Sequence, residues 1–202
     1  MKSFLLTAMA GIFLGLLFAP GLVYGQKFIV TGETAIFVTG TSTLHDWKAT
    51  VGKVSGHITL DKAFTKKASP AKGSTISEGT VSFEVKSMDG GRGAVMNDKI
   101  FNAFDAEKNP NIIFTLSKAV VSAVEADGTF TVDISGNLTM AGQTKPVTFP
   151  MKGKKEADGK YHFTGEKSVD MTAYGIEPPS AMFGQIETGK DVTIHFNLFF
   201  GV

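Results

Sequence analysis

Apolar and polar residues alternate with a period of two in segment after segment of this chain from Gln26 onward. The last segment has apolar side chains at every second position: Val192, Ile194, Phe196, Leu198 and Phe200. Earlier segments with the same pattern include Val54–Leu60, Val81–Val85, Ile112–Leu116 and Phe130–Met140. Because successive side chains of a strand point to opposite faces, this pattern predicts an antiparallel sheet with one apolar and one solvated face.

The stretch 136–150 predicts a complete β-hairpin. Leu138 and Met140 alternate with polar neighbours, the run Ala-Gly-Gln at 141–143 interrupts the pattern, and Val147 and Phe149 restart it. A short Gly-containing turn between two alternating runs is typical of a hairpin. Clusters of Gly, Asp, Asn and Pro separate the other segments at short intervals, which is the spacing of an all-β domain.

About eight alternating segments share an apolar face, and that face must be buried by closing the sheet or by stacking two sheets. Closure is favoured by the segment Gly90–Lys108, which breaks the alternation. Its residues Val95, Ile100, Phe101 and Phe104 have loose helical spacing, so a short helix there would cover one end of a barrel. We therefore predict an all-β fold: a single antiparallel β-barrel of about eight strands with a short helical insertion.

The first 25 residues have the order of a secretory signal peptide. Lys2 gives a positive start, Phe4–Ala19 is uncharged and almost wholly apolar, and Pro20 ends the run before Gly25. This run is shorter than the ~20 residues that a membrane-spanning helix needs. We predict cleavage before Gln26, one mature domain at 26–202 without a stable membrane span, and a periplasmic or secreted location.

Charge and cysteine content bear on which classes of function and stabilisation are expected. Without Lys2 the chain has 19 Lys and Arg against 19 Asp and Glu, and Arg92 is its one arginine. Nucleic-acid binding is not expected, because such affinity comes largely from cations that neutralise phosphates. The chain has no Cys, so its own core must stabilise the mature domain. The Lys-rich stretch Lys62–Lys72 is interpreted as a solvated loop.

The sequence contains no motif that predicts catalysis or metal binding. His45 and Asp46 are chain neighbours, which on a strand point to opposite faces and orient one another poorly. His57, His162 and His195 fall on the polar phase of different strands. A zinc site would lack its usual converging ligands. We therefore expect no catalytic residues, no metal and no cofactor, and not an enzyme.

Four motifs give the chain a resemblance to a known family. They are Thr43-Leu-His-Asp-Trp47, Val54-Ser-Gly-His-Ile58, the turn Asp105–Pro110 before an apolar strand, and Gly-x-Leu-Thr-x-x-Gly-x-Thr-Lys-Pro-Val at 136–147. With the matching strands they extend from about Thr39 to Phe200. The chain resembles the YceI-like family of exported, lipocalin-like bacterial proteins that bind isoprenoid lipids. The resemblance implies a lipocalin-like barrel and non-catalytic binding of an isoprenoid quinone or polyprenyl-type lipid.

The inward phase of the strands shows where such a ligand would lie. The residues predicted to line a cavity are Phe83, Phe114, Leu116, Phe130, Val132, Phe149, Phe163 and Phe196. His45 and Trp47 share one phase near the predicted mouth, where a ring nitrogen of His45 could hydrogen-bond a polar head group.

Two alternatives stay open for these residues. His45 could be a buried residue satisfied by a backbone carbonyl, without touching a ligand. The Phe side chains could simply fill the barrel, because an eight-stranded barrel has room for little more than its own side chains or one slim ligand. A filled barrel would be an interaction module that binds a partner protein through its loops. A homodimer is also left open.

Overall fold

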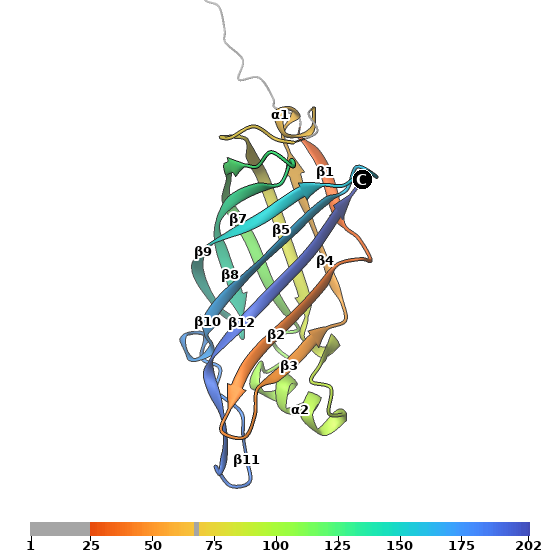
Figure 1. The fold of residues 1–202 in the computed structure, drawn as a ribbon. Helices are drawn as coiled ribbons and strands as arrows, with labels where there is room; N and C mark the ends of the chain where they lie inside the picture. The colour runs from red at the N-terminus through yellow and green to blue at the C-terminus, as the bar shows by residue number, and fades with distance from the viewer. Residues whose placement is uncertain (1–24, 67–68) are drawn as a thin grey trace, which may run out of the picture.

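Antiparallel strands close into a barrel around an apolar interior (Figure 1). The computed structural model describes residues 25–66 and 69–202. Its strands are β1 (Gln26–Val30), β2 (Ala35–Ser42), β3 (Trp47–Val51), β4 (Val54–Leu60), β5 (Thr75–Glu84), β6 (Met88–Asp89), β7 (Asn111–Val124), β8 (Phe130–Met140), β9 (Gln143–Lys155), β10 (Tyr161–Asp170), β11 (Ser180–Ala181) and β12 (Ile186–Gly201). The helices are α1 (Lys62–Thr65) and α2 (Ala94–Ala103), with 3-10 turns η1 (Val85–Ser87) and η2 (Met171–Tyr174).

The strand order of the closed ring is β1-β4-β5-β7-β8-β9-β10-β12, and β12 pairs back with β1. The segments β2, β3 and β6 extend this ring: β2 pairs with β12 beyond β1, β3 pairs with β2, and β6 pairs with β3. Apart from the pair that closes it, the ring follows the order of its strands along the chain, with β2 and β3 inserted between β1 and β4. The predicted antiparallel barrel of about eight strands is confirmed.

Strand β8 shows how the alternation builds the interior. Every second residue from Phe130 to Met140 is buried, while Asp133 and Asn137 between them are exposed. Gly136 occupies one of the inward positions, and a Cβ there would lie 2.5 Å from the Phe114 ring and 2.4 Å from the carbonyl oxygen of Thr115. Only glycine leaves room for Phe114 without a shift of the neighbouring strand.

The barrel closes where the chain passes from β1 to β2. The backbone N–H of Thr31 donates to the carbonyl oxygen of Phe199 (2.9 Å). Thr34 Oγ1 accepts from the backbone N–H of Phe199 (2.9 Å). These bonds hold the loop between β1 and β2 against β12. The strand pairing that closes the barrel therefore continues from β1 through the loop to β2.

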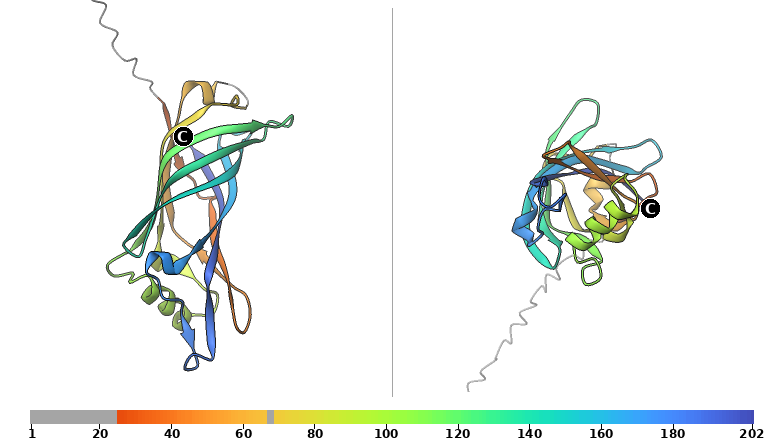
Figure 2. Two further views of the ribbon diagram at one scale, coloured as in Figure 1. Left: turned by 90° about the vertical axis from the view of Figure 1, so that its left-hand side faces the viewer. Right: turned by 90° about the horizontal axis from the view of Figure 1, so that it is seen from below.

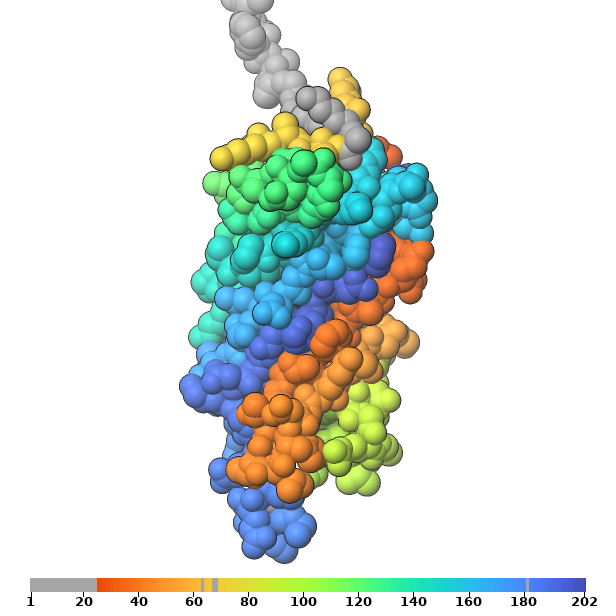
Figure 3. Space-filling model, viewed as in Figure 1, coloured from red at the N-terminus to blue at the C-terminus, as the bar shows by residue number. Residues whose placement is uncertain are grey.

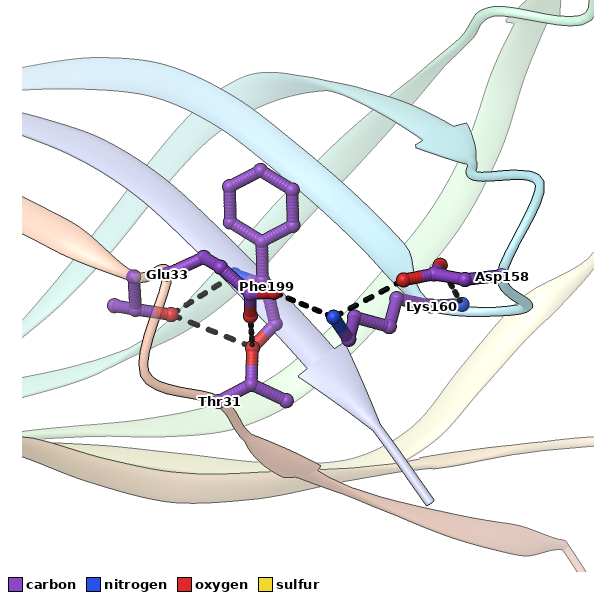
Figure 4. Close-up of polar contacts among 6 residues, drawn as sticks. Thr31, Glu33, Asp158, Lys160 and Phe199 are labelled. Carbon is purple, nitrogen blue, oxygen red and sulfur yellow. Dashed lines mark hydrogen bonds and ion pairs between the residues drawn. The ribbon is translucent and has the colours of Figure 1, made fainter.

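An ion cluster on the outer surface covers this closure (Figure 4). Lys160 Nζ lies 2.5 Å from a carboxylate oxygen of Glu33 and 3.0 Å from one of Asp158. The hydrogen bond from Lys160, followed by that from Thr31, lowers the pKa of Glu33 to about 2. The cluster links the β1–β2 loop to the turn between β9 and β10.

Helix α1 seals the end of the barrel at which β1 begins. Asp61 caps the helix by accepting from the backbone N–H of Phe64 (2.7 Å). The Phe64 side chain is completely buried, and its ring centroid lies 5.5 Å from that of Phe130 and 5.6 Å from that of Tyr161. The Tyr161 hydroxyl donates to the carbonyl oxygen of Phe64 (3.3 Å), and burial raises the pKa of Tyr161 to about 12.

The interpretation of Lys62–Lys72 as a solvated loop is wrong for its apolar residues. Phe64 and Pro70 are buried, whereas Lys62 and Lys66 are exposed. One helical turn is enough to separate these side chains onto opposite faces. This Lys-rich stretch therefore also contains Phe64, an apolar residue that fills the end of the lumen.

The opposite end carries α2 and the β11–β12 turn (Figure 2). Helix α2 falls within the predicted insertion Gly90–Lys108, so the predicted helical cover is confirmed. None of its residues is fully buried. In the space-filling view, α2 lies beside the β2–β3 turn at this end, and the β11–β12 turn projects beyond both (Figure 3).

The predicted signal peptide at residues 1–25 lies, except for Gly25, outside the described residues. Strand β1 begins at Gln26, the first residue of the predicted mature chain. Within residues 25–66 and 69–202, no helix is long and apolar enough to cross a membrane.

Candidate functional site

Two cavities within the described part of the barrel differ greatly in size. The outer cavity lies beside α2 and has a volume of about 280 Å³. The inner cavity lies in the middle of the barrel and has a volume of about 60 Å³. The outer cavity is close to the ≈ 300 Å³ at which small-molecule pockets begin, whereas the inner one holds only a few atoms. The outer cavity is therefore the candidate functional site, and we call its opening beside α2 the mouth.

The wall of the outer cavity is largely apolar and comes from several elements. Strands β2, β3 and β12, helix α2 and turn η2 all contribute to it. Four of the eight methionines of the chain line it: Met88, Met96, Met140 and Met171. Methionine side chains are flexible and fill irregular gaps, so such a wall can adapt to the shape of a ligand.

Polar side chains in the lining are few, and its charged residues are all basic. Lys48, Arg92 and Lys99 contribute, and no Asp or Glu among the described residues lines this cavity. Lys99 Nζ donates to the carbonyl oxygen of Ser180 (3.4 Å), which connects α2 to β11 beside the mouth. The ammonium group of Lys48 instead lies over the ring of Phe37 on the outer surface. The other two basic residues of the lining, Arg92 and Lys99, belong to the loop before α2 and to α2 itself.

Trp47 and His45, the two residues predicted near the mouth, both line the outer cavity; their binding of a ligand stays a prediction. The Trp47 ring lies against Gly40 of the paired strand, where a Cβ would be 2.4 Å from the ring. Trp47 Nε1 donates to the carbonyl oxygen of Thr41 (3.0 Å), which fixes the ring. The indole therefore presents a fixed apolar surface to the cavity.

The expectation that His45 continues the strand alternation is wrong. Strand β3 begins only at Trp47, and His45 lies in the preceding turn, where the Ser42 hydroxyl donates to its carbonyl oxygen (2.7 Å). The His45 side chain is exposed, so the alternative of a buried histidine is also wrong. Its Nδ1 lies 2.8 Å from the carbonyl oxygen of Asp46. Since a carbonyl only accepts, Nδ1 carries the proton and Nε2 of the neutral ring can accept from a ligand.

The predicted lining residues in the barrel separate into two groups. Those that line the inner cavity are Phe83, Phe114, Leu116, Phe149, Phe163 and Phe196. Phe130 and Val132 line neither cavity, because they are completely buried toward the sealed end, where Phe130 packs on Phe64. The phase of all eight residues is inward, but their depth along the barrel differs.

Sequence reasoning did not identify most of the wall of the outer cavity. Arg92 and Lys99 belong to the predicted insertion, but no role was predicted for their side chains, and Ile100 was expected only to help cover the barrel end. Met88 and Met140 lie at the ends of strand segments that point toward α2. Methionines gathered at strand ends were the signal that could have located this cavity.

The remaining histidines are on the outer surface, as their polar phase predicts. His57 pairs with Glu78 (3.6 Å), His162 with Glu156 (3.4 Å) and His195 with Glu166 (3.4 Å). In the described part of the chain, no group of three or more His, Cys, Asp or Glu side chains is placed to hold a metal ion.

Solved structures with similar folds include proteins of two bacteria. A polyisoprenoid binding domain from Saccharophagus degradans superposes with a TM-score of 0.66 at 13% identity, covering 88% of this chain and 99% of that one. Burkholderia cenocepacia BcnA superposes with a TM-score of 0.63 at 19% identity, covering 83% of this chain and 96% of that one. At these identities the likeness establishes the fold alone.

Curated relatives are UPF0312 proteins of Pseudomonas. The protein from Pseudomonas putida strain GB-1 is 36% identical over 84 residues, which are 38% of this chain and 40% of the relative. The protein from Pseudomonas fluorescens strain SBW25 is 37% identical over 73 residues, 33% of this chain and 37% of the relative. The matched part of the chain thus spans about two fifths of the length of these relatives.

The family model of the YceI-like domain matches residues 29–200, which is nearly the whole described barrel. This match includes every strand of the ring except the first residues of β1. The chain therefore belongs to the YceI-like domain family, as its motifs predicted.

Proposed function

We propose that this protein binds an amphiphilic lipid reversibly in the outer cavity, with the apolar tail against the cavity wall and the polar head at the mouth. The observation that carries the proposal is the cavity of about 280 Å³, whose wall is apolar and whose charged groups lie beside α2. Burial of a tail there would contribute about 0.8 kcal/mol per CH₂ group.

The lipid class we propose is isoprenoid: an isoprenoid quinone or a polyprenyl-type lipid. The solved structure with a similar fold from Saccharophagus degradans is described as a polyisoprenoid binding domain. Membership of the YceI-like family supports the same class for this chain. The adaptable methionines in the wall suit a tail made of branched, irregular units.

Binding without catalysis fits the polar groups at the mouth. General acid–base chemistry usually needs a carboxylate or a second base that orients the reacting group. In the part of the chain that the structure describes, no carboxylate lines the cavity, and the His45 ring is oriented by the carbonyl oxygen of Asp46. We also propose that the protein acts after export, in the periplasm or outside the cell, because residues 1–25 have the pattern of a signal peptide.

A second function, binding of a partner protein, is favoured by one observation. Exposed apolar side chains gather at the end that carries the mouth: Leu44, Val95, Met182 and Phe183. Phe183, in the β11–β12 turn, is fully exposed. Exposed apolar groups of this kind commonly mark an interaction surface.

Native mass spectrometry followed by lipid extraction tests the lipid proposal. Protein purified from its source cells should carry an extractable isoprenoid, and Val38→Phe, which places a ring in the outer cavity, should carry less. A matched variant, Phe183→Ala, should keep the lipid, because Phe183 does not line the cavity. A lipid-free native protein that fails to bind added isoprenoids would contradict lipid binding and favour the partner-binding function.

A further inference from the structure

Exposed apolar side chains surround the mouth of the outer cavity. They come from the β2–β3 turn, the start of α2 and the β11–β12 turn, which lie together at this end of the barrel (Figure 3). We call these side chains the apolar rim; its members are Leu44, Val95, Met96, Met182 and Phe183. Leu44 and Met96 also line the cavity, so the apolar wall continues outward into the rim.

The β11–β12 turn exposes its largest side chains at a cost in backbone free energy. Met182 and Phe183 have φ angles of 54° and 56°, in the left-handed region that bulky residues rarely adopt. The backbone N–H of Gln185 donates to the carbonyl oxygen of Met182 (3.2 Å) and closes a tight turn. Asn is a favoured residue type where Phe183 lies in such a turn. Because Phe183 is fully exposed, no burial within the described chain offsets this cost, and strain of this kind is concentrated at functional sites.

Hydrogen bonds fix the segments of the rim relative to one another. The backbone N–H of Thr43, in the β2–β3 turn, donates to the carbonyl oxygen of Glu187 (3.0 Å). In return, the backbone N–H of Glu187 donates to Thr43 Oγ1 (3.1 Å). Lys99 Nζ donates to the carbonyl oxygen of Ser180 (3.4 Å), which connects α2 to β11. The rim is therefore a preformed surface and not a set of independent loops.

Arg92 adds a positive charge to this surface. It is the only arginine of the chain, it lies exposed in the loop before α2, and it lines the outer cavity. Among the described residues, none forms a hydrogen bond or an ion pair with Arg92. A guanidinium group binds a phosphate through two parallel hydrogen bonds. The charge beside the rim is therefore complementary to the phosphate head groups of a lipid bilayer.

We propose that the apolar rim docks the mouth on the surface of a lipid bilayer. Met182 and Phe183 insert among the acyl chains, and Arg92 binds phosphate head groups, as exposed apolar and basic residues do in other proteins that lie on membranes. Two features favour a bilayer over a protein partner: the rim encircles an opening, and it continues into a cavity with an apolar wall.

This proposal rests on the proposed function, because a lipid ligand must pass from a bilayer into the outer cavity. In the docked state its tail passes from the acyl chains to the cavity wall without contact with water, which avoids the cost of hydrating apolar surface. Docking therefore changes the rate of lipid uptake and leaves the equilibrium affinity of the cavity unchanged.

Flotation with vesicles that contain no isoprenoid tests the docking. The protein should float with vesicles of phosphatidylcholine and more strongly with a two-to-one mixture of phosphatidylcholine and phosphatidylglycerol. Phe183→Asn should lower the ratio of bound to free protein by about tenfold, because an apolar ring is lost. Asn suits the left-handed backbone at this position, so the melting temperature should not fall.

Two further variants separate insertion from other effects. Val124→Asn removes an exposed apolar side chain near the sealed end and should float like the unmodified protein. Arg92→Gln should weaken binding to the mixed vesicles by about fivefold and leave binding to pure phosphatidylcholine unchanged. All variants are compared with the same N-terminus, so that residues 1–25 cannot cause a difference.

The absence of Cys from the chain allows insertion to be measured at single positions. Phe183→Cys, Val95→Cys and Val124→Cys are each labelled with the environment-sensitive dye nitrobenzoxadiazole. Vesicles should shift the emission of the first two labels to the blue, because these labels enter an apolar layer. The emission of the label at position 124 should not shift.

The outcomes separate docking from lipid binding. Farnesol added in solution, followed through the single tryptophan Trp47, should bind the unmodified protein and Phe183→Asn equally, whereas uptake of farnesol from vesicles should be slower in Phe183→Asn. If the unmodified protein does not float, or Phe183→Asn floats equally well, the docking proposal is wrong, and binding of farnesol would still support the proposed function. If the protein floats as expected but takes up no isoprenoid, docking is supported and the proposed function is contradicted.

Discussion

The two ends of this barrel are both covered by a helix, yet the helices do opposite things. Helix α1 has four residues and buries its Phe64 completely among aromatic rings. Helix α2 has ten residues and buries none fully. Beneath α1 the lumen is filled, and beneath α2 it holds a cavity of about 280 Å³. Helix length is therefore a poor guide to what a covering helix contributes to stability.

The two ends therefore have different roles: the sealed end stabilises the fold, and the other end holds the cavity. Aromatic packing at the sealed end fixes the barrel, because the rings of Phe64, Phe130 and Tyr161 contact one another closely. Leaving a cavity at the other end sacrifices contacts that a filled core would have.

The largest effect is expected from Phe64→Ala. Removing a completely buried ring from the sealed end should lower the free energy of unfolding by about 3–5 kcal/mol. Phe183→Ala, at the exposed tip of the open end, should change it by less than about 0.5 kcal/mol. Urea unfolding monitored by circular dichroism measures both. Equal losses would mean that the sealed end is not the stabilising one.

Adding side-chain volume should produce a smaller difference in stability between the two ends. Val132→Phe overpacks the sealed end and should cost about 1–3 kcal/mol. Val38→Phe enters the empty outer cavity, so its cost in stability should stay below about 1 kcal/mol. The same variant should weaken amphiphile binding by ~tenfold or more, the contribution of about two CH₂ groups. A severe loss of stability in Val38→Phe would show that the outer cavity is closed in solution.

The cap of α1 should contribute about 1 kcal/mol. In Asp61→Ala the backbone N–H of Phe64 loses its acceptor at 2.7 Å, and Thr75 Oγ1 loses a contact at 3.3 Å. Asp61→Asn keeps an acceptor oxygen and should restore most of the stability. Thermal melts compare the three proteins, and unchanged melting in Asp61→Ala would show that Phe64 holds α1 without its cap.

The smallest effect concerns pH and one exposed ion pair at each end. Hydrogen bonds from Lys160 and Thr31 lower the pKa of Glu33 to about 2, and those from Lys190 and Thr172 lower the pKa of Asp170 to about 2. Both pKa values are lower in the folded chain, so their stabilisation is complete above the ordinary values of 4.5 and 3.8. It should be lost as the pH falls toward 2.

Glu33→Gln and Asp170→Asn should each reduce the slope of stability against pH in this acidic window and leave the slope between pH 6 and 8 unchanged. Unfolding measured from pH 2 to 8 checks this. Because both pairs are exposed, 150 mM salt should reduce the difference further. A variant with an unchanged slope would show that its ion pair does not form in solution.

The sequence indicated which face of the sheet each residue occupies. It indicated much less about where along the barrel axis the residue lies. Alternation placed Phe114 and Phe130 on the inward phase, and both are inward. Yet Phe114 lines the inner cavity and Phe130 packs under α1. Depth depends on strand tilt and register, for example on Gly136 lying opposite Leu116, and a period of two contains no information on either.

Turns and cavities were predictable only in part. A helix in the segment 90–108 was predicted because the alternation stopped there. His45 was misplaced because the Ser42 hydroxyl bonds the turn before β3, a local contact that a strand pattern does not reveal. The volume of the outer cavity could not be predicted, because it is the space left over after side chains from several strands, helix α2 and turn η2 have packed.

The order of strands in the ring also has a consequence for how the chain reaches this structure. All neighbouring pairs but the closing one join ring strands that follow one another along the chain, although β2 and β3 lie between β1 and β4, so most hairpins can form early and at little cost in loop entropy. The exception joins Ile29 to Gly201 and Ile36 to Phe196, which must search over almost the entire chain. Closure is therefore the slow, committing event of folding, and a chain released with its first strand still unpaired would expose the edges of both β12 and β4.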